Sequence, residues 1–173
     1  PGSGSASAGF APQLNAPEKL TVEAWVRSSS TSGGSIVNYG NRQTGLSDTA
    51  DRALYLDNTG RVSFGLYSAS RVNLRSSNAI NDNQWHHVVG TYEPGMMRLY
   101  VDGVRVGQRI DVTWLRQYWG NWRIGGDRVN NFPNAPSSNY LNGSIDEVAV
   151  YGRALTLAQV RAHYEATGRT TAV

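Results

Sequence analysis

The segment Met97-Arg-Leu-Tyr-Val-Asp-Gly-Val-Arg-Val106 decides the fold class, because it has the pattern of a tight β-hairpin. Strand-forming residues stand on both sides of Asp102-Gly103, a dipeptide that tolerates the positive φ angles of two-residue hairpin turns. A second run, Leu20-Thr-Val-Glu-Ala-Trp-Val26, alternates and is rich in β-formers. Both segments predict antiparallel β-structure.

Further strand-like runs follow at short, regular spacing, at residues 35–39, 53–56, 61–67, 85–92, 122–124 and 144–151. Asp57-Asn-Thr-Gly60 has turn chemistry and predicts another hairpin. Three longer stretches, 40–52, 111–120 and 127–140, lack strand character and are expected to be loops that carry function. The regular spacing predicts an all-β sandwich or barrel.

One helix is expected near the end of the chain. Thr156-Leu-Ala-Gln159 is a capping-box pattern, and Leu157, Val160 and Tyr164 fall on one face at helical spacing. Gly168 is a stop signal. We expect this helix to lie as a lid over one edge of the sandwich.

Composition narrows the functional classes. The chain has 173 residues, enough for one domain, and it has no cysteine, which excludes disulfides and thiol catalysis. The net charge of +3 is spread over scattered arginines, an arrangement that argues against nucleic-acid binding. No apolar run reaches the roughly 20 residues of a membrane helix. We expect a linker at residues 1–5, a domain at 6–168 and a tail at 169–173.

Four blocks resemble a known family: Leu20–Val26, Gln84-Trp-His-His-Val-Val89, Arg98-Leu-Tyr-Val-Asp-Gly103 and Gly143-Ser-Ile-Asp-Glu-Val-Ala-Val-Tyr151. They are similar to the laminin G-like, concanavalin A-like jelly-roll modules and occur in the order of that family. The resemblance implies an all-β fold, a two-sheet antiparallel jelly-roll β-sandwich with one short C-terminal helix. It also implies a secreted, non-catalytic carbohydrate-binding module that binds an oligo- or polysaccharide and is joined to a catalytic domain of the same polypeptide.

The acidic residues of the predicted strands do not suggest an enzyme. Sandwich glucanases need two carboxylates on one face of a strand, but Asp146 and Glu147 are neighbours and are expected to point to opposite faces. His86 and His87 are expected to diverge in the same way. The resemblance places Asp146 at a position that often contributes to a structural Ca²⁺ site, which makes calcium a possible cofactor.

The binding hypothesis depends on aromatic and polar side chains in the predicted loops. An aromatic ring can stack on the apolar face of a sugar, and Trp114, Tyr118 and Trp119 cluster within one loop. Trp25 and Trp85 lie within strand patterns and are expected in the core. Polar side chains that suit sugar hydroxyls complete the predicted site: Arg42, Asp51, Arg71, Arg123, Asp127 and Asn139.

Three alternatives to sugar binding stay open. Laminin G-like modules also bind proteins, so a protein-interaction or adhesion domain is the first. A spacer that stabilises a neighbouring catalytic domain is the second. A weak hydrolase or lyase is the third, and it would need two carboxylates roughly 5–9 Å apart in a groove.

Overall fold

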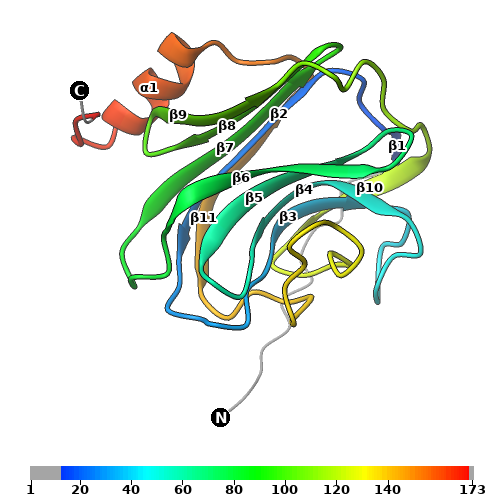
Figure 1. Ribbon diagram of the computed structural model, residues 1–173, viewed down its shortest axis with the longest axis horizontal. Helices are drawn as coiled ribbons and strands as arrows, with labels where there is room; N and C mark the ends of the chain where they lie inside the picture. The colour runs from blue at the N-terminus through cyan, green and yellow to red at the C-terminus, as the bar shows by residue number, and fades with distance from the viewer. Residues whose placement is uncertain (1–12, 172–173) are drawn as a thin grey trace.

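The computed structural model describes residues 13–171, which form two antiparallel sheets packed face to face (Figure 1). In sheet order, the six-stranded sheet contains β1 (Leu14–Asn15), β10 (Trp119–Ile124), β3 (Gly34–Gly40), β4 (Ala50–Leu56), β5 (Arg61–Tyr67) and β6 (Arg71–Ala79). The five-stranded sheet contains β11 (Ser144–Tyr151), β2 (Leu20–Arg27), β7 (His86–Glu93), β8 (Met96–Val101) and β9 (Val104–Arg109). The predicted jelly-roll sandwich is therefore confirmed, while the predicted linker at 1–5 lies outside the described residues.

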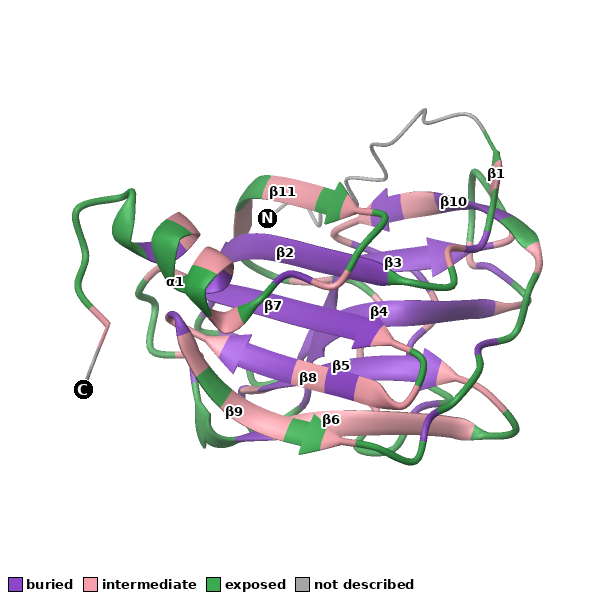
Figure 2. Cartoon of the chain, turned by 90° about the horizontal axis from the view of Figure 1, so that it is seen from above, coloured by how far each residue is buried: buried purple, intermediate pink, exposed green. Residues whose placement is uncertain are grey.

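The core fills the space between the two sheets, where apolar side chains from both inner faces meet. The strands β2, β4 and β7 in the middle of the sheets are almost wholly buried (Figure 2). The packing depends on a close approach at Gly90, where an added Cβ would lie 2.4 Å from the ring of Phe64. The alternating patterns of the sequence thus become one continuous hydrophobic core.

The two predicted hairpins are present. Residues 57–60 connect β4 to β5, and Asp102-Gly103 connects β8 to β9 with φ angles of 50° and 75°. Two strands were not predicted, the short β1 and the long β6. β6 was missed because Arg71–Ala79 is mostly polar, as suits the last strand of a sheet with a solvated outer face. β10 also begins earlier than predicted, at Trp119.

The expected helix is α1 (Leu157–Glu165), and its capping box between Thr156 and Gln159 is formed. Its position differs from the prediction. The helix lies on the outer face of the five-stranded sheet, where Val160 packs with Val89 of β7 and Tyr100 of β8 (Figure 2). The helix thus covers the face of this sheet rather than its edge.

The loop between β10 and β11 covers part of the other outer face. Its residues Val129 and Phe132 pack on Ala53 and Tyr55 of β4. An added Cβ at Gly65 of β5 would lie 2.7 Å from the Phe132 ring, so this glycine lets the loop lie close to the sheet. Among residues 13–171, no helix has the length and apolar character needed to cross a membrane.

Candidate functional site

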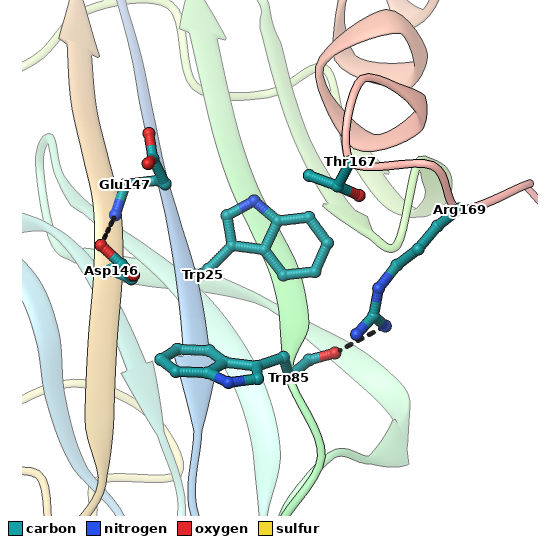
Figure 3. Close-up of a pocket in the computed structure, with 6 residues that line it drawn as sticks. All are labelled: Trp25, Trp85, Asp146, Glu147, Thr167 and Arg169. Carbon is teal, nitrogen blue, oxygen red and sulfur yellow. Dashed lines mark hydrogen bonds between the residues drawn. The ribbon is translucent and has the colours of Figure 1, made fainter.

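The outer face of the five-stranded sheet carries large side chains from the strand positions that alternate with the core positions. The even-numbered residues from Leu20 to Val26 point into the core, so Glu23 and Trp25 between them point outward. Trp25 is buried, as expected, with 9% of its surface exposed, but it packs on this outer face and not between the sheets. Trp85, also expected in the core, is half-buried and lies beside Trp25 (Figure 3).

Two adjoining hollows on this face form what we term the sheet groove. The first, of about 310 Å³, is drawn in Figure 3. The second, of about 450 Å³, runs toward Tyr151 and His163 and shares Trp25, Glu147 and Thr167 with the first. The groove lies between β11 and the C-terminal helix, on side chains that β2 and β7 hold in place. The lining of the first hollow consists of Trp25, Trp85, Asp146, Glu147, Thr167 and Arg169.

Two arginines frame the indole rings of the sheet groove. The guanidinium carbon of Arg169 is 5.1 Å from the ring centroid of Trp25, and its Nη1 donates a hydrogen bond of 3.0 Å to the Trp85 carbonyl. The guanidinium carbon of Arg27 is 5.2 Å from the Trp85 ring. These contacts position both rings and place positive charge beside them.

Two carboxylates enter the groove together, contrary to the expectation that Asp146 and Glu147 diverge. The pairing of β11 with β2 shifts between Asp146 and Ala149, so β11 contains a bulge there. Glu147 has a φ of 48°, and its N–H donates a 2.8 Å hydrogen bond to Asp146 Oδ1. The bulge breaks the alternation, and both side chains line the same hollow (Figure 3).

A third carboxylate, Glu23, lies at the floor of the second hollow. Its Oε1 accepts from the Tyr151 hydroxyl at 2.9 Å, and both its oxygens lie 3.1 Å from His163 Nδ1. His87 Nε2 lies 3.6 Å from the Glu23 Oε2. Burial opposes ionisation of Glu23, but His87, His163 and Tyr151 together hold its pKa below the usual 4.5. Glu23 therefore joins the helix to the sheet as a charged group.

Asp146 is the residue at which the resemblance implies a structural calcium ion. Within residues 13–171, no group of three or more His, Cys, Asp or Glu side chains is placed to hold a metal ion. One oxygen of Asp146 accepts a hydrogen bond from the Glu147 N–H at 2.8 Å. Calcium binding at Asp146 stays a prediction.

Three of the predicted ligand residues are buried and hydrogen-bonded. Asp51 and Arg52 form an ion pair of 2.7 Å with both side chains fully buried. Asp127 is also fully buried and accepts from the Ser47 hydroxyl at 2.7 Å. Arg123, 3% exposed, donates to the carbonyls of residues 42 and 45. These groups therefore hold loops on the sheet, and none of them lines the sheet groove.

Two further predicted residues also have internal partners. The hydroxyl of Tyr118 donates to Asp51 Oδ1 at 2.8 Å, and Asn139 Oδ1 accepts from the N–H of Val129 at 3.1 Å. Arg42 is exposed but pairs with Asp48 at 2.7 Å.

Trp114 and Trp119 are exposed, at 52% and 65%, and neither lines the sheet groove. A role for these two rings in binding stays a prediction. Arg71 lies on the outer face of the other sheet, as described below.

Sequence reasoning missed most of the sheet groove. Trp25 could have been found, because it occupies the polar phase of an alternating strand. The contribution of Glu147 could not have been found, because the bulge that turns its side chain into the groove has no local signal in the sequence. The sequence predicts a tail at 169–173, but the side chain of Arg169 lies over the Trp25 ring and donates to the Trp85 carbonyl.

Comparison with solved structures shows the same fold in proteins of several kinds. The native heptameric SAP-like pentraxin from Limulus polyphemus is 22% identical, with a TM-score of 0.66, over 92% of this chain and 77% of that one. The CBM40 of Ruminococcus gnavus IT-sialidase, bound to α2,3 sialyllactose, is 16% identical, with a TM-score of 0.65, over 91% of this chain and 96% of that one. Domains LG4-5 of the mouse laminin α1 chain are 19% identical, with a TM-score of 0.60, over 91% and 45% of the two chains.

Comparison of sequences adds a partial relative and a family. A UPF0102 protein of Rhizorhabdus wittichii is 35% identical over 69 residues, which are 40% of this chain and 49% of that protein. The chain thus matches only about half the length of this curated relative. A family model described as the concanavalin A-like lectin/glucanases superfamily matches residues 2–161, which is nearly the whole chain. The chain therefore belongs to the concanavalin A-like lectin/glucanases superfamily.

Proposed function

We propose that this domain binds carbohydrate in the sheet groove and does not itself catalyse a reaction. The observation that carries the proposal is the combination in one groove of two indole rings with carboxylate and guanidinium groups. Supporting it, the family includes lectins, and one structural neighbour was solved with sialyllactose bound.

The lining has the chemistry that a sugar requires. An indole ring can pack against the apolar C–H face of a pyranose, and Trp85 is the more accessible of the two rings. Asp146 and Glu147 can accept hydrogen bonds from sugar hydroxyls, and Arg169 can donate to them. Because the groove is shallow and open, we expect dissociation constants on the order of micromolar to millimolar.

The setting of the domain is part of the same proposal. We infer that it is one module of a larger secreted protein that acts on polysaccharides, and that it holds a catalytic domain of the same polypeptide near its substrate. The resemblance of sequence blocks supports this setting, as does the neighbour from a sialidase, whose described chain is a binding domain of matching length.

One observation favours a second function, glycoside hydrolysis. The groove brings Glu23, Asp146 and Glu147 to one face of the sheet, whereas the sequence pattern separates the last two. Paired carboxylates are the usual catalytic groups of glycosidases. Glu23 is nevertheless tied to two histidines and Tyr151, so binding remains the better-supported function.

The test is calorimetry and affinity electrophoresis of the chain against a panel of polysaccharides, with product analysis for new reducing ends. We expect at least one polysaccharide to bind, and Trp85→Ala to weaken that binding by roughly 10-fold or more.

Matched controls are Trp114→Ala and Trp119→Ala, which remove exposed indoles outside the groove. If these controls abolish binding while Trp85→Ala keeps it, the site lies in the predicted aromatic loop and not in the groove. Failure of the folded chain to bind any polysaccharide contradicts the proposal, and new reducing ends that disappear in Glu147→Gln indicate the hydrolase.

A further inference from the structure

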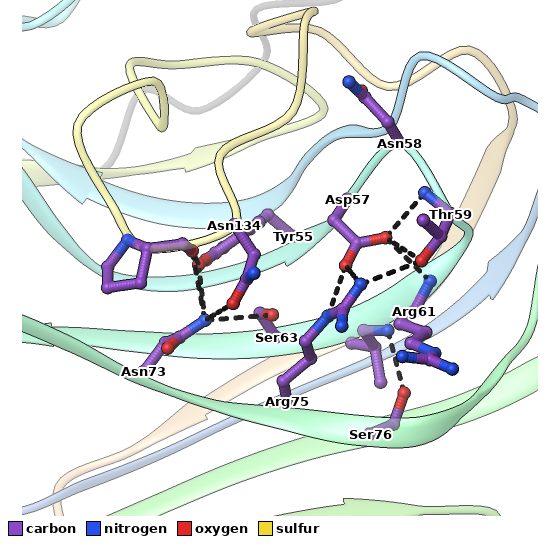
Figure 4. Close-up of polar contacts among 12 residues, drawn as sticks. Tyr55, Asp57, Asn58, Thr59, Arg61, Ser63, Asn73, Arg75, Ser76 and Asn134 are labelled. Atoms are coloured by element: carbon purple, nitrogen blue, oxygen red, sulfur yellow. Dashed lines mark hydrogen bonds and ion pairs between the residues drawn. The ribbon is translucent and has the colours of Figure 1, made fainter.

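The outer face of β6 presents a row of three polar side chains, Arg71, Asn73 and Arg75. The last two have firm partners, which Figure 4 shows. Arg75 binds Asp57 through its Nε and Nη2, and its Nη2 also donates to the Thr59 hydroxyl at 2.9 Å. Although burial opposes ionisation, Thr59 and Arg75 hold the pKa of Asp57 below 3.8. The Arg75 charge is therefore neutralised within the sheet.

The second member of the row, Asn73, also has partners within the protein. Its Nδ2 lies within hydrogen-bonding distance of the Tyr55 hydroxyl at 3.0 Å and of the Pro133 carbonyl at 3.1 Å (Figure 4). This contact ties the loop between β10 and β11 to the sheet. Asn73 and Arg75 are thus structural, and the remaining member of the row is Arg71.

Arg71 differs from both neighbours because it has an aromatic contact and no acidic partner. Its guanidinium carbon lies 4.2 Å from the ring centroid of Tyr67, its cross-strand partner in β5, and 5.9 Å from that of Phe132. Its Nε is buried and has no hydrogen-bond partner in the structure. A buried donor of this kind has a free-energy cost.

A second arginine reaches the same ring from another part of the chain. Arg116, in the loop before β10, has its guanidinium carbon 4.9 Å from the Tyr67 ring centroid, and its Nη1 donates to the Tyr67 hydroxyl at 2.6 Å. Its backbone N–H donates to the Tyr67 carbonyl at 2.8 Å, which fixes the loop on the strand. Arg116 itself is exposed.

Two unneutralised guanidinium groups therefore share one tyrosine ring. Within residues 13–171, neither Arg71 nor Arg116 has a carboxylate oxygen within 4.0 Å, whereas Arg42, Arg52, Arg75 and Arg109 each have one at 2.7 Å or less. Two cations held at one aromatic ring repel each other, and an anion between them would relieve that repulsion.

We propose that Arg71, Tyr67 and Arg116 form a second glycan site, selective for the carboxylate of an acidic sugar. A guanidinium group matches a planar carboxylate in shape and can bind both its oxygens. The Tyr67 and Phe132 rings beside the arginines offer apolar surface for the sugar ring. This second site lies on the other sheet from the groove, so it goes beyond the proposed function. It rests on that function in one respect, that the ligand is a glycan.

The test uses an oligogalacturonate, its neutral methyl ester and a sulfated neutral oligosaccharide, each titrated into the full chain by calorimetry. We expect the oligogalacturonate to bind at least about 10-fold more tightly than the ester. Arg71→Gln and Arg116→Gln should each weaken its binding by a similar factor. Arg105→Gln, on the exposed part of β9, removes the same charge away from the site and should leave binding unchanged.

Other outcomes would overturn this inference. Equal binding of acid and ester, or preference for the sulfated sugar, contradicts selectivity for a carboxylate. Equal losses in Arg105→Gln and Arg71→Gln indicate attraction by overall charge alone. Because Arg116 is exposed, its variant decides the matter if Arg71→Gln does not fold. Trp85→Ala should keep oligogalacturonate binding, so the groove and this site can fail independently.

Discussion

Asp51 and Arg52 are adjacent in β4, yet both side chains are completely buried. Strand alternation would separate them, but Arg52 has a φ of 48° and the pairing of β3 with β4 shifts at this point. The distortion turns the guanidinium group back so that it can bind both oxygens of Asp51, at 2.7 and 2.8 Å. A residue pair that resembles a polar ligand site in the sequence is thus a buried ion pair in the structure.

Breaking this pair should be costly. In Arg52→Leu the buried Asp51 carboxylate loses its counter-ion, and we expect a loss of about 3–5 kcal/mol in the free energy of unfolding. Urea denaturation measures it. The double variant Asp51→Asn/Arg52→Leu removes the stranded charge and should recover part of the loss. Equal stability of the single variant and the parent would contradict a buried pair.

The contact between Gly90 and Phe64 gives a second prediction at the scale of the residue. Gly90→Ala places a methyl group where the Phe64 ring lies, so we expect a loss of about 1–3 kcal/mol from overpacking. Gly152→Ala is the matched control, because no atom lies within 4 Å of the added Cβ. Thermal or urea unfolding compares the two variants, and equal effects would show that the contact at Gly90 is not close.

At the scale of the element, helix α1 is held on the five-stranded sheet by apolar and ionic contacts. Val160 packs on the sheet, while His163 on the next turn reaches the Glu23 carboxylate of β2. The C-terminal segment that follows brings Arg169 over Trp25. The docking of the helix and the shape of the groove therefore both depend on the Glu23 carboxylate.

Acid should weaken this docking. The pKa of Glu23 is lowered in the folded state, so its stabilising contribution is complete above the unfolded value of about 4.5 and is lost as the pH falls below it. We expect Glu23→Gln to be less stable than the parent at pH 7 and closer to it at pH 3. Urea denaturation across this range measures the difference.

Glu147→Gln serves as the control for that experiment, because its carboxylate is exposed in the same groove. It should follow the pH dependence of the parent. A Glu23→Gln variant whose stability deficit stays constant from pH 7 to pH 3 would show that the ionised form of Glu23 has no special role.

How far the sequence predicts the structure depends on where the backbone is regular. Alternation and turn chemistry were enough to identify both hairpins, the helix cap and the sandwich. They failed at Arg52 and Glu147, two residues with positive φ that lie at shifts in strand pairing. Both shifts depend on pairing with a strand distant in sequence, so no local pattern could indicate them.

At the scale of the whole molecule, many neighbouring strands come from distant parts of the chain. β1 and β3 pair with β10, and β2 pairs with β11 near the end of the described residues. Such pairings bring together segments separated by more than 80 residues. The loop-closure entropy must be overcome before these contacts can form.

We therefore expect slow refolding, with time constants of roughly milliseconds to seconds. Stopped-flow dilution from urea, followed by tryptophan fluorescence, measures it. Thr156→Ala, which removes a local helix cap, should change the refolding rate little, because that cap forms within one short segment. Refolding within microseconds would contradict the dominance of long-range pairing.

The bulge in β11 adds one residue to the surface of the strand and leaves its inward-facing residues in place. Ile145 and Val148 both pack on the core, although residues three apart in a regular strand point to opposite faces. The extra residue of the bulge thus lets Val148 face the core again and places the Glu147 carboxylate on the outer face of the sheet. A chain that lacked Glu147 would lose one carboxylate from the sheet groove and would keep the hydrophobic interior unchanged.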